Sequence, residues 1–142
     1  MPDSTDIVAL ARAWIGTPYH PQAALRGAGC DCIGLIRGVL ADLGGPALDV
    51  PPYTADWSGD ADREPLLAAA RLHLREIPIG NAMPGDIVVF RWRAERAASH
   101  AAIIANETRI IHAIDRAPVC EVTLSPQWRR RIVAAFRFPE VA

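Results

Sequence analysis

The sequence contains few cysteines, no long apolar run and no excess of charge, and each absence excludes a class of protein. Its three cysteines, Cys30, Cys32 and Cys120, are odd in number. Cys30 and Cys32 also stand too close to brace a fold by pairing with each other, so we expect no disulfide framework. No stretch approaches the roughly 20 apolar residues of a membrane span. The net charge of −1 gives no indication of nucleic-acid binding.

The first residues also lack the pattern of an export signal. Positions 1–14 carry acidic groups where a secretory signal carries Lys or Arg, and their apolar residues are interrupted. We therefore expect a protein made in the cytoplasm without a signal peptide and without membrane insertion.

The composition is that of an ordinary globular protein. With 142 residues, 51% apolar and 22% charged, the chain is long enough to bury a core without a structural metal. It shows no internal repeat and no low-complexity tract. We expect one domain, residues 1–142.

The N-terminal half carries helical patterns. Apolar residues keep helical spacing over 6–14, over 32–43 and from Glu64-Pro65 to about Ile77. The second segment has the clearest ends, because Asp31 is a capping residue and Gly44-Gly45 stops the helix. Loops are expected at 16–29 and 45–62, the latter with two aromatic residues that can dock on the core, Tyr53 and Trp57.

The C-terminal half changes to short β-rich runs. Close spacing of these runs predicts an antiparallel sheet with hairpins over 87–91, 100–105, 109–114, 119–124 and 132–138. Helices followed by strands define an α+β domain.

Cys32 falls in the first turn of the predicted 32–43 helix. Unpaired backbone N–H groups and the helix dipole favour an anion there, and a thiolate is such an anion. A cysteine in this position can have a pKa well below about 8.5 and act as a nucleophile at neutral pH. The alternative is that Cys32 is a small apolar residue that packs at the start of the helix.

Two histidines on adjacent predicted strands favour the catalytic interpretation. If the hairpin closes with Ala105 opposite Arg109, Ala102 faces His112, and His100 and His112 share one face, roughly 7 to 8 Å apart by backbone. A slip of one residue would separate them. Two buried imidazoles need partners, so a site with His100 as base and His112 as its orienting residue is expected.

At these positions the sequence resembles the NlpC-type papain-like cell-wall peptidases. The resemblance rests on the ordered set Gly16-Thr17-Pro18-Tyr19, Asp31-Cys32-Ile33-Gly34-Leu35, residues 84–90, Ser99-His100-Ala101-Ala102-Ile103 and Ile111-His112-Ala113. Cys30-Asp31-Cys32 and the Val50-Pro51-Pro52-Tyr53-Thr54 loop leading to Trp57 are similar to the branch found in phage tails and gene transfer agents.

The resemblance implies a papain-like α+β fold with helices packed on a C-terminal antiparallel sheet. It assigns Cys32 as nucleophile, His100 as base and His112 as orienting residue, and implies that the Tyr19 hydroxyl polarises the scissile carbonyl. His20, Asp31 and Ser99 are candidate residues of the substrate groove. No cofactor and no metal are implied.

The implied activity is hydrolysis of peptidoglycan stem peptides at the D-glutamyl-diaminopimelate bond. A wall hydrolase without an export signal has to be carried to its substrate, so we expect assembly into a phage-like tail or gene transfer agent particle beside other tail or baseplate proteins. Ile33, His20-Pro21-Gln22 and Ala102 differ from the family pattern, and the second difference changes the rim of the groove.

Two other classes of protein remain open. Cys30, Cys32 and a histidine could bind zinc, although paired zinc cysteines are usually two to four residues apart. A structural tail-tip or baseplate protein with weak or no peptidase activity is the other alternative. Cys30 precedes the Asp31 cap and is expected to be a loop thiol without a catalytic role.

Overall fold

The computed structural model describes residues 4–48, 50, 52–53, 57 and 63–140. Within these ranges the helices are α1 (Ser4–Arg12), α2 (Cys32–Asp42), α3 (Pro65–His73) and α4 (Pro126–Arg129), with a 3-10 turn at Ile79–Asn81. The strands are β1 (Ala24–Leu25), β2 (Gly29–Cys30), β3 (Arg75–Ile77), β4 (Ile87–Phe90), β5 (His100–Ile104), β6 (Arg109–His112), β7 (Cys120–Thr123) and β8 (Ile132–Arg137). No helix in the described ranges has the length and apolar character to cross a bilayer.

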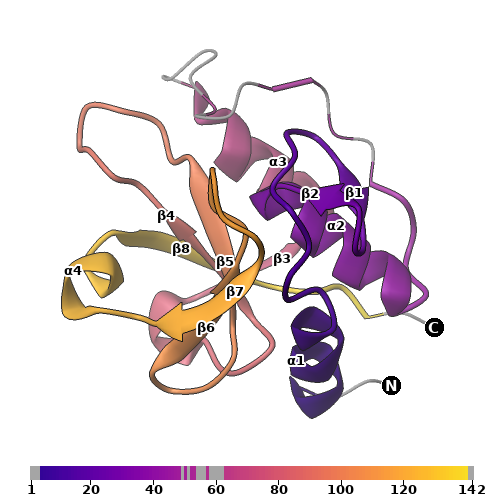
Figure 1. Ribbon diagram of the computed structural model, residues 1–142. Coiled ribbons are helices and arrows are strands. Elements are labelled where there is room, and N and C mark those ends of the chain that lie inside the picture. Colours follow the sequence, from indigo (N-terminus) through magenta and orange to yellow (C-terminus); the bar gives the residue numbers. More distant parts are fainter. Residues whose placement is uncertain (1–3, 49, 51, 54–56, 58–62, 141–142) are drawn as a thin grey trace.

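Strands β3 to β8 form an antiparallel sheet in the order β3-β8-β4-β5-β6-β7, and β1 and β2 form a separate hairpin. Helices α1, α2 and α3 lie on one side of this sheet and α4 lies on the other (Figure 1). The expected α+β class is confirmed, as are the five predicted strands, with ends that move by one or two residues.

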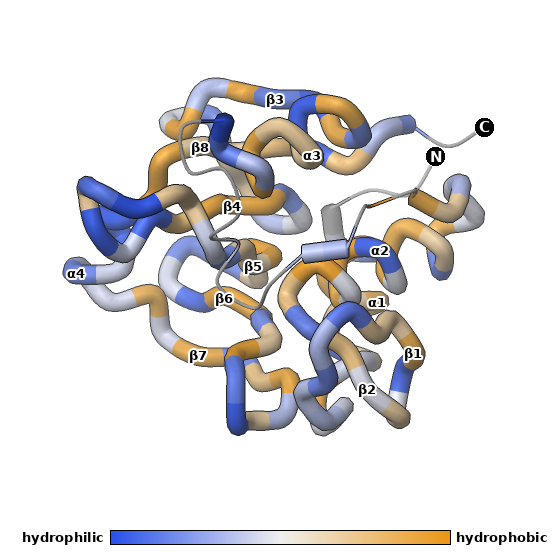
Figure 2. The backbone as a smooth tube through the Cα atoms, turned by 90° about the horizontal axis from the view of Figure 1, so that it is seen from above, coloured by the Kyte–Doolittle hydropathy of each residue, from blue (hydrophilic) through white to orange (hydrophobic). Residues whose placement is uncertain are grey.

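Each face of the sheet has its own apolar core. On the helix side, Ile87, Val89 and Ala101 pack with residues of α1, α2 and α3. On the opposite side, Val88, Phe90 and Ala102 form a smaller core that Trp92 and Trp128 cover. Because a core covers each face of the sheet, β4 and β5 are buried on both faces, and apart from His100 these central strands are hydrophobic (Figure 2).

Two expectations about the N-terminal half were wrong. The third helix ends at His73 because Leu74 is extended, and Arg75–Ile77 then forms β3, which pairs with Arg137–Ala135 of β8. The 16–29 segment is not all loop, since it contains the β1–β2 hairpin. Short strands of two or three residues carry too little apolar alternation to be recognised in sequence.

The predicted register of the β5–β6 hairpin is confirmed. Ile103 lies opposite Ile111 and Ile104 lies opposite Ile110, while the Ala105 N–H donates to the Arg109 carbonyl at 2.9 Å. In this register His100 and His112 project from the same face of the sheet.

Gly34, in the first turn of α2, permits the close approach of the loop that precedes β1. A Cβ atom built on Gly34 would lie 1.8 Å from the carbonyl oxygen of Ala23, which is backbone and cannot rotate away. The absence of a side chain at Gly34 therefore brings the 17–23 loop against the start of the helix.

We predict that Gly34→Ala lowers the free energy of unfolding by about 1–3 kcal/mol, the usual cost of overpacking. Gly80→Ala is the matched control, because a Cβ there meets no atom within 4 Å. Urea denaturation monitored by tryptophan fluorescence measures both. Equal stability of the two variants would contradict this account of the contact.

Candidate active site

The carboxylate of Asp31 organises the start of α2. Asp31 is 2% exposed, and its Oδ1 accepts the N–H of Gly34 at 2.7 Å, as an N-cap residue does. Its Oδ2 accepts the backbone N–H of Gln22 at 2.7 Å and the hydroxyl of Tyr53. Asp31 thus joins two loops to the helix.

Cys32 is the first residue of α2, as predicted, and its sulfur interacts with the backbone of Ala101 in β5. Its own N–H, that of Ile33 and that of Ala101 are directed at the sulfur. Ala101 follows His100 in β5 and lies beyond the last β5–β6 pair, Ile103 with Ile111. The sulfur therefore meets β5 next to His100, where this strand is no longer paired with β6.

The resting Cys32 is a thiol. The side chain is 7% exposed, and burial together with the Asp31 charge raises its pKa to about 12 despite the opposing effect of the three N–H groups. The position of Cys32 at a helix start predicts a lowered pKa, and this prediction is wrong. The sequence does not show how completely β5 and the loops exclude water from the sulfur, and the effect of desolvation on the pKa is larger than that of the helix start.

The two histidines form a hydrogen-bonded pair. His100 Nε2 and His112 Nδ1 lie 2.9 Å apart, and both side chains are buried, at 5% and 3% exposure. Burial lowers the pKa of His100 to about 3, with a further contribution from His112, and burial lowers the pKa of His112 to about 4. Both imidazoles are therefore neutral at physiological pH and can exchange a proton with a neighbour.

Aromatic rings enclose this pair on the side of the sheet away from α2. Trp128, half-buried on α4, meets the His112 ring edge-on at 5.4 Å and the His100 ring at 6.1 Å. Trp92 stacks on His100 at 5.7 Å, and Phe90 lies at the same distance. The sequence does not predict the roles of Trp92 and Trp128, because both residues lie between the predicted strands.

Tyr19 lies on the loop that borders Cys32. A parallel bridge links Tyr19 to Cys30, with the Cys30 N–H donating to Pro18 O and the His20 N–H donating to Cys30 O, both at 3.0 Å. Burial raises the pKa of Tyr19 to about 12, with contributions from Cys32 and Asp31, so the hydroxyl is protonated and can donate a hydrogen bond.

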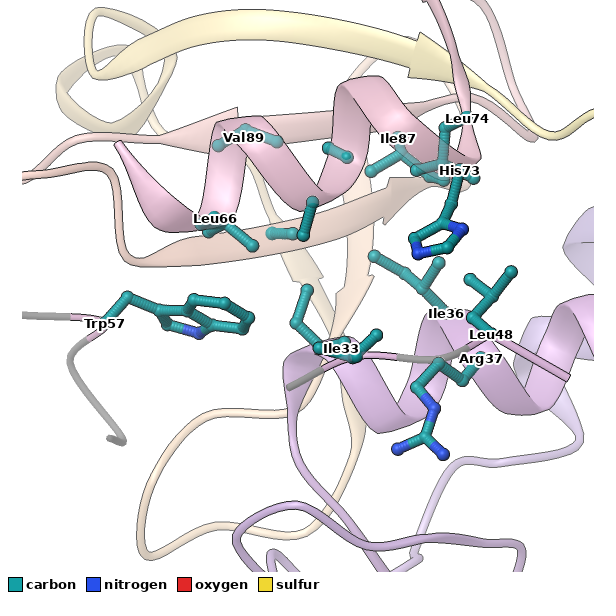
Figure 3. Close-up of a pocket in the computed structure, with 14 residues that line it drawn as sticks. Ile33, Ile36, Arg37, Leu48, Trp57, Leu66, His73, Leu74, Ile87 and Val89 are labelled. Carbon is teal, nitrogen blue, oxygen red and sulfur yellow. The ribbon is translucent and has the colours of Figure 1, made fainter. Parts of the chain in front are cut away.

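A second loop reaches the site through Tyr53 and Trp57. Their rings stack with centroids 4.0 Å apart, and the Tyr53 carbonyl accepts the side-chain amide of Gln22 at 2.9 Å. Trp57 is 3% exposed and lies beside Ile33 in an apolar pocket between α2, α3 and the sheet (Figure 3). The expectation that both aromatics dock on the core is confirmed.

The remaining candidates are distributed around the site. His20 is exposed at the loop surface, and Ser99 is half-buried, with its N–H donating to Phe90 O at 3.1 Å. Cys30 is fully buried in β2, where burial raises its pKa to about 12, and it lies in a strand instead of the expected loop. Cys120 is opposite His112 in β7.

Within the described ranges, no three His, Cys, Asp or Glu side chains gather closely enough to hold a metal ion.

Family comparison accounts for this combination of fold and residues. The NlpC/P60 family model matches residues 16–137, which contain Tyr19, Cys32 and both buried histidines. The chain belongs to the NlpC/P60 family. No curated protein sequence matches it.

Solved structures show the same fold. An NLP/P60 family protein of Staphylococcus aureus, described as similar to a lipoprotein, is 24% identical with a TM-score of 0.66, and the match covers 99% of this chain and 43% of that one. The NlpC/p60 domain of the peptidoglycan hydrolase SagA is 23% identical with a TM-score of 0.65, covering 96% of this chain and 100% of that one. The peptidoglycan hydrolase RipB of Mycobacterium tuberculosis is 15% identical with a TM-score of 0.61, covering 95% and 64%. The chain thus spans less than half of the first of these proteins.

We predict that the free energy of unfolding falls by about 4 kcal/mol between pH 7 and pH 5, about 2 kcal/mol for each buried histidine. The unfolded chain takes up protons near pH 6.5, whereas the folded histidines titrate only near pH 3 and pH 4. Stability is therefore lost as the pH falls below 6.5. His112→Asn should lose only about half as much. Urea denaturation of both proteins at the two pH values measures this, and an identical pH dependence would contradict the burial of His112.

Trp128→Ala should raise the pKa of His112 towards 6.5, because the indole ring covers that imidazole. Trp128→Phe keeps an aromatic cover and should leave the pKa near 4. Titration of the His112 ring signals by NMR distinguishes the two variants. An unchanged pKa in Trp128→Ala would show that the ring does not keep water from His112.

Proposed function

We propose that the protein is a cysteine peptidase that hydrolyses peptidoglycan stem peptides. The observation that supports this most directly is the His100–His112 hydrogen bond, placed beside a strand residue whose N–H is directed at the Cys32 sulfur. A cysteine-hydrolase centre consists of a thiol, a neutral imidazole and a second group that orients the imidazole.

The neutral resting state defines the first step. His100 Nε2 is engaged with His112, which leaves His100 Nδ1 as the base that takes the Cys32 proton. The thiolate attacks the scissile carbonyl carbon as the proton moves, so the sulfur need not be ionised beforehand. The orienting bond to His112 stabilises the imidazolium that forms.

The remaining steps return the enzyme to its starting state. The N–H groups at the start of α2 and the protonated Tyr19 hydroxyl stabilise the tetrahedral oxyanion. The imidazolium of His100 then protonates the leaving amine, the C–N bond breaks, and a thioester remains on Cys32. Water, deprotonated by His100, hydrolyses the thioester and regenerates the thiol.

The substrate class is proposed from the family relationship. SagA and RipB, which share the fold, are described as peptidoglycan hydrolases. The resemblance of the Cys32, His100 and His112 segments to NlpC-type peptidases supports the D-glutamyl-diaminopimelate bond as the point of cleavage.

We also propose that the protein reaches the wall on a phage-like tail or gene transfer agent particle, in contact with tail or baseplate proteins. The support is the likeness of Cys30-Asp31-Cys32 and of the Tyr53 to Trp57 loop to that branch of the family.

A structural tail-tip protein with weak or no activity is the alternative, and one observation favours it. Cys32 is 7% exposed, and the loop contacts of Gln22, Asp31 and Tyr53 lie beside it. In this alternative the buried thiol has no access to a peptide and the domain serves for assembly only.

Digestion of purified peptidoglycan, with mass analysis of the released fragments, tests activity and bond choice together. We predict fragments that end at D-glutamate and begin at diaminopimelate. Cys32→Ala should reduce the rate at least about 1,000-fold, since the nucleophile is lost.

Cys30→Ala is the control, because this second thiol is two residues away and buried in β2. It should retain most of the activity. Loss of activity in Cys30→Ala with retention in Cys32→Ala would reassign the nucleophile. Intact peptidoglycan after incubation with the wild-type protein would favour the structural alternative.

A further inference from the structure

Two arginine-rich segments meet at the end of the sheet that carries the histidine pair. Residues 91–96 contain three arginines and residues 129–131 contain three more. Antiparallel pairing of β4 with β8 brings them together, with Phe90 opposite Ile132 and the Arg91 N–H donating to Arg131 O at 2.9 Å. β4 and β6 end here, and β5 and β8 begin, so His100 and His112 belong to the same edge.

Some of these arginines have structural tasks. The Arg91 guanidinium forms an ion pair with Glu64 and donates to Arg96 O, and Arg129 donates to Glu107 O at 3.0 Å. Arg131 donates to the Trp92 carbonyl, which fixes the two segments to each other. Hydrophilic stretches accordingly gather around α4 (Figure 2).

A pocket opens between the two segments. It is lined by Trp92, Gln127, Trp128, Arg130 and Arg131. Its two indole rings are the rings that cover the catalytic histidines, at 5.7 Å from His100 and 5.4 Å from His112. A group bound in this pocket contacts the same two indole rings that contact the imidazoles.

The lining suits a planar anion. Guanidinium groups bind carboxylates through paired, charge-assisted hydrogen bonds, and the Gln127 amide adds a donor. The chain contains no lysine, so every basic side chain has this forked geometry. Because the net charge of the whole chain is −1, the surface outside these segments is net acidic, and an anionic ligand is directed to them.

We propose that the Trp92–Arg130 pocket is a subsite for a carboxylate of the peptide whose cleavage takes place at Cys32. Nearness to the histidines favours an anion on the substrate itself, since a separate polyanion would need a longer surface. The choice of peptide in the test below rests on the proposed function, whereas the carboxylate preference rests on the pocket.

Binding to the Cys32→Ala protein tests this without cleavage. The probe is L-alanyl-γ-D-glutamyl-meso-diaminopimelyl-D-alanine, together with versions in which one carboxylate at a time is an amide, titrated by calorimetry. We expect one amidation to weaken binding about 10-fold or more, the loss of a charge-assisted pair. Adding Arg130→Gln should weaken binding of the unmodified peptide to the same level and remove the effect of that amidation alone.

Arg93→Gln is the matched control, since it removes the same charge from an exposed residue of the 91–96 segment that does not line the pocket. The Arg93→Gln variant should still bind the unmodified peptide more tightly than the amidated one. The proposal would be overturned if Arg93→Gln weakened peptide binding as much as Arg130→Gln does. It would also be overturned if Arg130→Gln kept the difference in affinity between carboxylate and amide peptides, or if no peptide bound. The two proposals can fail separately. If the wild-type protein digests peptidoglycan but the Cys32→Ala protein binds all peptides equally, the subsite is refuted and hydrolysis is not. If the Cys32→Ala protein prefers one carboxylate but the wild-type protein leaves peptidoglycan intact, hydrolysis is refuted and the subsite is not.

Discussion

The buried carboxylate of Asp31 holds together the segments that surround the Cys32 sulfur. One oxygen caps α2, and the other receives the Gln22 amide and the Tyr53 hydroxyl. A buried carboxylate is stable only when its acceptor sites are used, so the cap and both loops form together. The position of Cys32, the course of the Tyr19 loop and the docking of the Tyr53 loop therefore depend on one side chain.

The chemistry follows from burial as much as from residue type. Desolvation raises the pKa of the Cys32 thiol to about 12 and lowers that of His100 to about 3, so the neutral forms of both are favoured before substrate binds. A neutral pair avoids two buried charges in the resting protein. In the proposed mechanism, charge appears only when the thiol proton moves to an imidazole that His112 already orients.

Much of this site could be predicted from the sequence because its elements are local. Asp31 before a helical run and Gly44-Gly45 after it define α2, and the β5–β6 register follows from a three-residue connection at 106–108. The β3 strand, the β1–β2 hairpin and the aromatic cover of Trp92 and Trp128 could not be predicted. The β1–β2 hairpin is too short to show an apolar alternation. The positions of β3 and of the two indole rings depend on pairing with β8 and on packing against His100 and His112, which are contacts between distant segments. The raised pKa of Cys32 was missed for the same reason.

The central claim is that Cys32 becomes acylated during turnover, and covalent trapping tests it most directly. A stem peptide labelled at its N-terminal half, incubated with the protein and quenched in acid, should leave its label on the peptide that contains Cys32, as a thioester that hydroxylamine releases. The account predicts this adduct in the wild-type protein and its absence in Cys32→Ala. A label found on Cys30, or peptide cleavage without any thioester, would contradict it.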